Sequence, residues 1–475
     1  MPDVAIDGPT LDGALLDQAP PDSAASDADA APDPSLLQIL GDTEGWAEGI
    51  DVELDPQGNA VIAGEFGGTI NIGPDTLSQS PPAPWTKGGD GLLAKTSAAG
   101  SWLWGKTTAR GNPGTSFYHR LKINSVGESY YVGTIAGTVE IGNQQHSPAV
   151  SAGFLLKVDS SGTHLWHDVY DCGGITDADG VGIDGAGNAY VSGSFEKTLQ
   201  IGGLAVTSKG GSDIYLLKVD PAGTPVWLIG AGGGKDDAGR AIAVAPNGSV
   251  YIGGLFTGQA TFGSVTLTAV GTTAGSGATA AFVAEVSPAG VVNWVAQGGT
   301  STAGGNVAAT EAIAVHSDGT LRVGGLFEGQ GTFGSTVLTG TPQVANSFVA
   351  ALDGSGTFKW AVRLGKGVAT DLWLDKTGVT YAVGALAGTA AFGSTANGGI
   401  DAFVARVAPG GQVLGGILGG GLVEDAAYGI TGDGAGNLFV AGYVRGPGPV
   451  QFGTQKPVLD GTEHLFLWKL PNSWL

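Results

Sequence analysis

From residue 36 onward, one pattern of apolar and polar positions returns seven times along the chain. Each copy opens with a short apolar segment that ends in a turn rich in Gly, Asn and Asp, and a second apolar segment follows at once. Short segments bounded by such turns are typical of antiparallel β-strands. The openings are IDVELDPQGN (50–59), LKINSVGES (121–129), VGIDGAGN (181–188), IAVAPNGS (242–249), IAVHSDGT (313–320), LWLDKTGV (372–379) and GITGDGAGN (429–437).

Two markers recur at nearly fixed spacing in the second strand and beyond it. A glycine occupies one fixed place, and an Ile-Gly or Phe-Gly pair follows whose own glycine lies nine residues later, or eleven in the seventh copy. The fixed glycines are Gly64, Gly133, Gly193, Gly254, Gly325, Gly384 and Gly442. The pairs begin at Ile72, Ile141, Ile201, Phe262, Phe333, Phe392 and Phe452. Glycine permits close backbone approach and sharp turns, so these positions predict closely packed sheets.

A third and a fourth strand complete each copy. The third strand, such as FLLKV (154–158), leads through a tight turn into a fourth that opens with Trp in five copies. These are Trp104, Trp166, Trp227, Trp294 and Trp360. The sixth copy has Gly415 at this place, and the seventh has no fourth strand before Leu475. Four antiparallel strands in each of seven repeats predict an all-β, seven-bladed β-propeller over residues 36–475.

Residues 36–41 (LLQILG) precede the first copy and match the end of a fourth strand, ILGG at 417–420. This segment is therefore predicted to be the outer strand of the last blade. Such a 3+1 closure joins both ends of the repeat array and removes an open seam.

The repeat resembles the bacterial seven-bladed β-propeller (SBBP-type) repeat family, found in surface and secreted lipoproteins of Gram-negative bacteria. The resemblance rests on D-x-x-G-N-x-Y-V-x-G-x-F from Asp184 to Phe195, followed by the Gly-containing pair and the third strand. It implies the propeller fold and an extracellular or outer-membrane location, but no particular biochemical activity.

Two segments, KVDPAGTPVW (218–227) and ALDGSGTFKW (351–360), resemble the tryptophan-docking motif of pyrroloquinoline-quinone-type propellers. The resemblance implies that Trp packs between blades. The catalytic carboxylates and vicinal cysteines of those quinoproteins have no match here, which argues against a quinoprotein dehydrogenase.

Composition narrows the classes of partner. The formal net charge is −22, with 86 Gly and only 13% charged residues. Eight of the negative charges are Asp residues in the first 35 positions, which leaves −14 on the rest of the chain. An acidic protein without clustered Lys and Arg is unsuited to nucleic-acid backbones. The lone Cys172 excludes an intrachain disulfide, and no Cys/His cluster suggests zinc. His164 and His167 are expected on opposite faces of one strand, unable to share a metal.

Residues 1–35 are rich in Asp, Pro and Ala without a strand or helix period. Such a segment is predicted to be a disordered acidic tether. It resembles the spacers that follow the lipid-anchored cysteine of bacterial surface lipoproteins, which implies a lipid anchor upstream of the sequence given. No apolar run is long enough for a transmembrane segment, and no signal peptide is evident in the sequence as written.

The turns between strands one and two, and three and four, are short and alike, and their Asp residues are predicted to form the turns. The opposite face carries connections of variable length, where binding is expected. Candidate ligand-binding residues on that face are Trp46, Trp85, Tyr118, Asp236, Asp237, Glu424 and Asp425. Three further acids, Asp90, Asp213 and Asp401, precede third strands at the same spacing and are predicted to cap loops.

The sequence favours a non-catalytic binding or scaffolding propeller at the bacterial cell surface, with a protein or glycan partner on the variable-loop face. The alternative is a carbohydrate-active enzyme, a glycosidase or lyase, that uses paired carboxylates on that face. No catalytic residue, metal ligand or cofactor is assigned, although the acidic loop face could hold a cation such as calcium.

Overall fold

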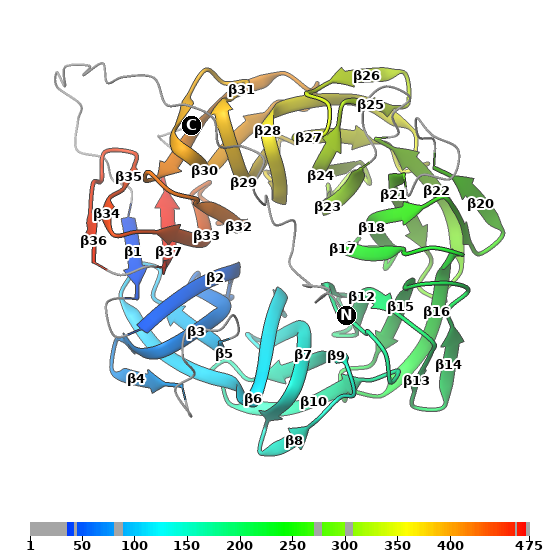
Figure 1. Cartoon of the computed structure of the whole chain (residues 1–475), viewed down its shortest axis with the longest axis horizontal. Coiled ribbons are helices and arrows are strands. Elements are labelled where there is room, and N and C mark those ends of the chain that lie inside the picture. Colours follow the sequence, from blue (N-terminus) through cyan, green and yellow to red (C-terminus); the bar gives the residue numbers. More distant parts are fainter. Residues whose placement is uncertain are drawn as a thin grey trace.

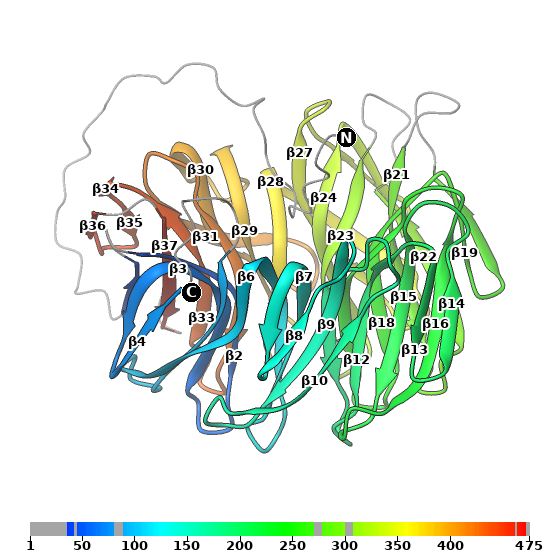
Figure 2. The ribbon, with the colours of Figure 1, turned by 60° about the horizontal axis from the view of Figure 1, so that its bottom comes forward.

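The computed structural model describes residues 36–41, 45–79, 89–269, 278–299, 307–460 and 463–471, except for the side chains of 112–119. Within these ranges every regular element is a β-strand, and no helix is long and apolar enough to span a membrane. Figure 1 shows the sheets standing around a central axis, and Figure 2 shows the same arrangement turned by 60°. The all-β prediction is confirmed, and the architecture is that of a β-propeller.

The strands nearest the axis contact one another in cyclic order, and the last of them contacts the first. In chain order they are β2 (Gly45–Leu54), the second half of β6 (Trp102–Ile123), β11 (Gly180–Ile183), β17 (Ala238–Val244), β23 (Ala308–Val315), the second half of β28 (Phe358–Leu374) and β32 (Ala426–Gly432). The strands β6 and β28 are long because each leaves the outer edge of one sheet and continues as the innermost strand of the next.

Second and third strands follow outward, each antiparallel to its neighbour. The second strands are β3 (Ala60–Ile72), β7 (Ser129–Ile141), β12 (Ala189–Phe195), β18 (Val250–Thr257), β24 (Leu321–Glu328), β29 (Thr380–Thr389) and β33 (Leu438–Arg445). The third strands are β5 (Asp90–Thr96), β9 (Ser151–Val158), β15 (Asp213–Val219), β21 (Thr279–Val286), β27 (Ala345–Leu352), β30 (Thr395–Val407) and β37 (Glu463–Leu470).

The outer strands complete the sheets. Besides the first halves of β6 and β28, they are β10 (His164–Tyr170), β16 (Pro225–Gly233), β22 (Val292–Gly298), β31 (Val413–Gly420) and β1 (Leu36–Leu40). The strand β1 pairs antiparallel with β37, from Leu36 opposite Lys469 to Leu40 opposite Leu465. The beginning of the described chain therefore lies beside its end, as Figure 1 shows in blue and red.

A bulge in the innermost strand explains the fixed glycine of the second strand. The pairing skips one residue in the innermost strand, at Ile50, Arg240 and Glu311 for example. A Cβ placed on Gly64 would lie 2.0 Å from the carbonyl oxygen of Glu48 in that strand. The same contact would be 1.9 to 2.0 Å at Gly193, Gly254, Gly325, Gly384 and Gly442. Any side chain at this position would collide with backbone, so only glycine fits.

The Ile-Gly and Phe-Gly pairs mark the tips of small hairpins on the outer rim. These hairpins use the end of β3 with β4 (Asp75–Ser78), the end of β7 with β8 (Gln144–His146), β13 (Thr198–Ile201) with β14 (Leu204–Thr207), β19 (Gln259–Phe262) with β20 (Val265–Thr268), and β25 (Gln330–Phe333) with β26 (Thr336–Thr339). In the last copy the corresponding strands are β34 (Gly448–Pro449), β35 (Gln451–Phe452) and β36 (Val458–Leu459).

The glycine of such a pair forms the turn, and the apolar residue before it packs in the core. Gly263 has a φ of 57°, a left-handed conformation that favours glycine, and Phe262 is fully buried against Phe282 with ring centroids 4.7 Å apart. The strand β19 also pairs with β16 of the preceding sheet. The hairpin thus ties neighbouring sheets together and covers part of an exposed edge.

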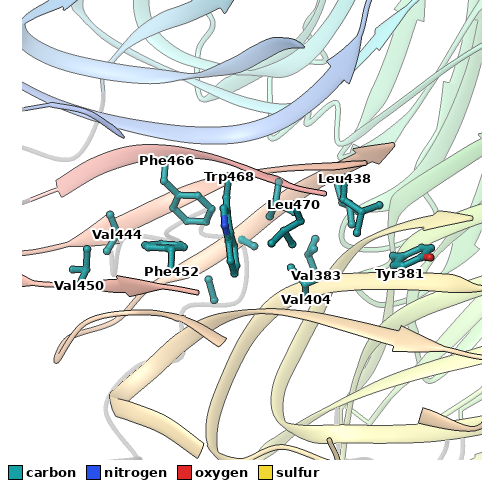
Figure 3. Packing of buried hydrophobic residues seen from close by; sticks show 14 of the residues in the cluster. Tyr381, Val383, Val404, Leu438, Val444, Val450, Phe452, Phe466, Trp468 and Leu470 are labelled. Atoms are coloured by element: carbon teal, nitrogen blue, oxygen red, sulfur yellow. The ribbon is translucent and has the colours of Figure 1, made fainter. Parts of the chain in front are cut away.

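The apolar core lies between adjacent sheets. In one cluster, Val383 and Val404 of one sheet pack against Leu438 and Trp468 of the next (Figure 3). The ring of Phe452, from the rim hairpin, lies 5.2 Å from that of Trp468. Because both faces of a sheet are apolar, each sheet depends on its two neighbours for burial.

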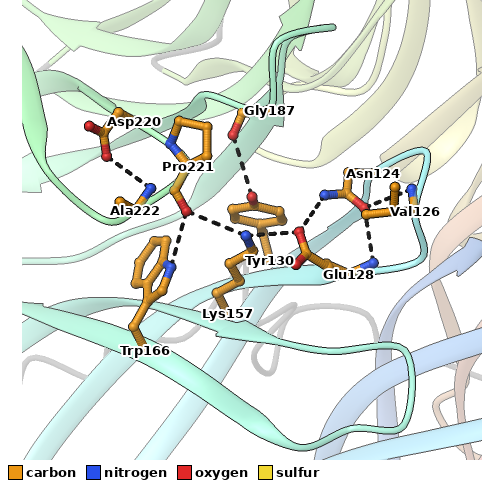
Figure 4. A network of polar contacts seen from close by, with 10 residues as sticks. All are labelled: Asn124, Val126, Glu128, Tyr130, Lys157, Trp166, Gly187, Asp220, Pro221 and Ala222. Atoms are coloured by element: carbon orange, nitrogen blue, oxygen red, sulfur yellow. Dashed lines mark hydrogen bonds and ion pairs between the residues drawn. The ribbon is translucent and has the colours of Figure 1, made fainter.

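The tryptophans of the fourth strands join neighbouring sheets, as the docking-motif resemblance implies. In four of the five, the indole Nε1 donates to a carbonyl in the turn between the third and fourth strands of the next sheet. The donor–acceptor distances are 3.3 Å for Trp166 to Pro221, 3.0 Å for Trp227 to Pro288, 3.1 Å for Trp294 to Gly354 and 2.8 Å for Trp360 to Pro409. In Figure 4, Lys157 reaches the same Pro221 carbonyl and pairs with Glu128 at 2.8 Å.

Candidate functional site

The short turns on one face of the ring are held by their own aspartates. Asp184 Oδ1 accepts hydrogen bonds from the amides of Ala186 and Asn188, each at 2.9 Å. Asp433 makes the same pair of contacts in its turn. The prediction that these aspartates form turns is confirmed, and their carboxylates are occupied by backbone amides.

On the opposite face, two of the candidate binding residues are buried inside the loop framework. The carboxylate of Asp237 accepts from the amides of Thr257 at 2.8 Å and Gly233 at 2.7 Å. Asp425 accepts from the amides of Arg445 at 2.8 Å and Gly421 at 2.6 Å. Each aspartate therefore fixes the entry to an innermost strand instead of facing solvent.

The three acids predicted to cap loops each accept a hydrogen bond from a backbone amide, and they stand at the start of β5 and β15 and within β30. Asp90 accepts from the amide of Gly111 at 3.0 Å, Asp213 from Lys209 at 2.7 Å and Asp401 from Asn397 at 2.8 Å. Burial raises the pKa of Asp401 to about 6. Burial also raises the pKa of Asp425 to about 7, and the charge of Asp401 adds to this shift. These carboxyls consequently bind a proton more tightly in the folded protein than in the unfolded chain.

The remaining candidates do not meet in one place. Asp236 is exposed, and its Oδ1 accepts from the amide of Ser212 at 3.1 Å. Trp46 is half-buried, and a Cβ on Gly67 would lie only 2.1 Å from its Nε1, so the indole packs against the backbone of its own sheet. Trp85 and the side chain of Tyr118 lie outside the described residues. The predicted aromatic platform therefore stays a prediction.

One group of charged side chains on the variable-loop face does come together from distant segments. Arg445, at the end of β33, pairs with Glu424 at 3.2 Å and with Glu463, at the start of β37, at 3.1 Å. Glu48 of β2 hydrogen-bonds to Glu463 and lies opposite Glu65 of β3 in the strand register. These five residues form the Arg445 cluster, which lies where the first and last copies of the repeat meet.

The Arg445 cluster has a buried side, at Glu48, and a solvent-facing side. Burial raises the pKa of Glu48 well above its usual range, the charges of Glu463 and Glu65 raise it further, and Arg445 opposes the shift. The side chains of Arg445 and Glu424 are 38% and 47% exposed. The guanidinium lies 4.7 Å from the ring centroid of Tyr443, which packs against Tyr428. Acids outnumber the guanidinium in the cluster, so this surface attracts positive charge.

Two exposed apolar side chains adjoin the cluster. Leu422 and Val423, directly before Glu424, are 70% and 47% exposed. The connection is fixed to β30, because Ile400 forms an isolated parallel bridge with Glu424. The carbonyl oxygen of Ile400 also accepts a hydrogen bond from the amide of Asp425. A fixed connection that leaves two apolar side chains in solvent beside paired charges has the chemistry of a binding surface.

Charged residues of the innermost strands pair with one another inside the ring. Arg120 of β6 donates to the carbonyl oxygens of Thr370 at 2.8 Å and Glu311 at 3.4 Å, which belong to other sheets. Glu311 pairs with Arg240. Burial raises the pKa of Asp179 to about 7, an effect that Arg240 opposes and Glu311 strengthens. Asp179 and Glu311 are therefore engaged within the ring rather than at a solvated rim.

The expectation for His164 and His167 is wrong, because the two imidazoles lie on the same side of β10. A register shift between His164 and Trp166 breaks the regular alternation of side chains. His164 Nε2 lies 2.9 Å from His167 Nδ1, and His146 Nε2, from the rim hairpin, lies 2.8 Å from His167 Nε2. Within the described ranges no group of three or more His, Cys, Asp or Glu residues is already arranged to hold a metal ion.

No family model matches this sequence, and no curated protein matches it. Among solved structures, the WD40 domain of Neurospora crassa Pan2 has a TM-score of 0.46 and 10% identity, with 91% of this chain and 96% of that chain covered. The Dos1 propeller has a TM-score of 0.42 and 11% identity, covering 92% and 95%. A virginiamycin B lyase from Staphylococcus aureus has a TM-score of 0.43 and 9% identity, covering 91% and 99%. Similarity at this level identifies no function for this chain.

The substitution Asp401→Asn tests the protons held by the buried carboxyls. The raised pKa values of Asp401 and Asp425 contribute stability that is present below about pH 4 and lost as the pH rises through 6 to 7. The introduced side-chain amide retains an acceptor for the backbone amide of Asn397 and removes the charge beside Asp425. We expect the variant to melt above the wild type at pH 8 and to show no gain at pH 4. The account would be contradicted if the melting temperatures of the variant and the wild type differed by the same amount at pH 4 and pH 8. It would also be contradicted if the exposed control Asp460→Asn gave the same gain.

Proposed function

We propose that the ring consists of seven blades and that β1 closes it. The cyclic contacts of the innermost strands and the pairing of β1 with β37 support this proposal. Leu36 also packs on Gly100, in the turn of the first sheet, much as Trp166 packs on Gly223 between two other sheets. In the sixth copy, Gly415 stands where other copies have Trp. In the last copy, β1 takes the place of the fourth strand that would otherwise follow β37.

Deleting residues 1–41 tests the closure when it is compared with deletion of residues 1–35. The longer deletion removes β1 and the buried Leu40, and one buried Leu contributes about 2 kcal/mol. We expect a clearly lower midpoint of urea unfolding for the longer deletion and almost no change for the shorter one. Equal midpoints for the two variants would show that β1 is dispensable for closure.

We propose further that the chain is a non-catalytic binding propeller whose partner docks on the variable-loop face at the Arg445 cluster. The observation that carries the proposal is the exposure of Leu422 and Val423 beside the paired charges of Glu424 and Arg445. Apolar contact supplies affinity, and the surrounding acids select the partner by charge. The complementary partner is a polypeptide segment that combines apolar side chains with Lys or Arg.

An array of synthetic peptides that vary in charge and hydropathy tests this surface with the full-length chain. We expect binding of peptides that carry both basic and apolar residues, weaker binding at higher salt, and a loss of about tenfold in Leu422→Ser, equal to about 1.4 kcal/mol. Val337→Ser is the matched control, because Val337 is 53% exposed on the distant hairpin strand β26. Equal weakening in both variants, or binding that ignores peptide charge, would contradict the proposal.

The second candidate is a carbohydrate-active enzyme, favoured by the contact between Glu48 and Glu463. Burial and the neighbouring Glu463 raise the pKa of Glu48, and acid–base cleavage of a sugar chain uses a pair of carboxyl groups of which one has a raised pKa. This candidate would be supported if no peptide on the array bound and the chain cleaved a polysaccharide from a test panel. The cleavage should then be lost in Glu48→Gln. Binding to a glycan array without cleavage of any polysaccharide would instead indicate a sugar-binding surface.

We also propose a bacterial cell-surface location, which the resemblance of residues 1–35 to lipoprotein spacers supports. Protease treatment of intact cells that express the full natural gene tests this point. We expect cleavage of the Asp- and Pro-rich segment without lysis of the cells. Protection of the protein in intact cells, with cleavage only after lysis, would place it inside.

A further inference from the structure

The three histidines on the outer rim form a continuous chain, His164 to His167 to His146, which we call the histidine chain. They are three of only six histidines in the sequence, and they come from two segments, β8 and β10. The ring centroids of His146 and His167 lie 5.0 Å apart, and those of His164 and His167 5.1 Å apart. The hairpin and the bulge in β10 together produce this meeting, and because the bulge recurs at the same place in the other outer strands, the histidines themselves distinguish this copy.

The histidine chain opens onto a cavity whose other walls carry carboxylates. The cavity has a volume of about 480 Å³, and its lining includes His146, His167, Asp168 and Asp171. Asp168 follows His167 directly in the regular part of β10, so its carboxylate lies on the opposite face of that strand from the imidazole. The two imidazole nitrogens are donors suited to zinc and to neighbouring first-row metals.

We propose that His146 and His167 bind a divalent transition-metal ion at this cavity, with water completing its coordination. Their Nε2 atoms now lie 2.8 Å apart, at hydrogen-bond distance. Two ligands of a tetrahedral zinc ion lie about 3.3 Å apart when each Zn–N distance is about 2.05 Å. The ion would therefore require the hairpin strand β8 to move by about half an ångström from β10. His164, which reaches only His167 Nδ1, is assigned as a positioning residue that orients the ligand ring.

Titration of the full-length chain with Zn²⁺ against a chromophoric chelator tests the site. We expect one ion per chain, and a loss of affinity of at least about tenfold in His167→Ala and in His146→Ala, since removing even a supporting group costs that much. The control is His316→Ala, because His316 lies on a different sheet beside Asp318, and it should bind as the wild type does. His164→Ala should weaken binding less than His167→Ala does.

A second readout separates ligation from loss of structure. Co²⁺ should give a visible absorption band of a four-coordinate nitrogen and oxygen site that is absent in the His146→Ala, His167→Ala double variant. Zn²⁺ should raise the melting temperature of the wild type but not that of the double variant. Zn²⁺ binding of equal strength in the wild type and in the folded double variant would overturn the proposal. The histidine chain would then be a hydrogen-bonded part of the rim.

Discussion

Each sheet of this protein is a single layer with two apolar faces, and it cannot bury either face by itself. Every sheet must therefore be covered by a neighbouring sheet on both sides. This constraint explains why the links between sheets are so numerous and so regular. The fourth-strand tryptophans bind the next turn, and the rim hairpins pair with the preceding outer strand. The glycine opposite the bulge leaves room for the backbone of the innermost strand. The same constraint leaves the first and last sheets dependent on each other, and β1 lies at that junction.

The repeated parts of the fold could be predicted because they follow from local chemistry. Asp184 and Asp433 form the turns that their sequences indicate, and Asp401 caps its loop. The bulges could not be predicted, since the fixed glycine indicates a close approach without saying what approaches. A separate bulge, in the outer strand β10, made the expectation for His164 and His167 wrong, because a bulge shifts side chains from one face to the other.

The candidate site was predictable only in part, for a related reason. Glu424 was singled out, but its partner Arg445 and the inner acid Glu48 belong to segments whose proximity depends on how the ring closes. No spacing within one repeat encodes a contact between the first and the last. Asp237 and Asp425, by contrast, have carboxylates that could serve a binding site, but these carboxylates are buried and accept hydrogen bonds from backbone amides. The sequence does not show which acids are buried in this way.

The repeat also explains why the unusual chemistry concentrates at two places. Within the repeated copies many acids have a structural partner, such as a turn amide for Asp184, a strand amide for Asp237 and Arg240 for Glu311. At the junction of the last and first sheets, one neighbour is a strand from elsewhere in the chain, and the equivalence is broken. The acids there share one guanidinium beside exposed Leu422. The histidine chain, by contrast, uses a regular feature of the repeat, because the bulge that brings His164 and His167 to one side of β10 recurs at the same place in the other outer strands. In a scaffold whose buried positions are occupied by packing, the side chains that can differ between copies are those at the closure of the ring and on its exposed rim.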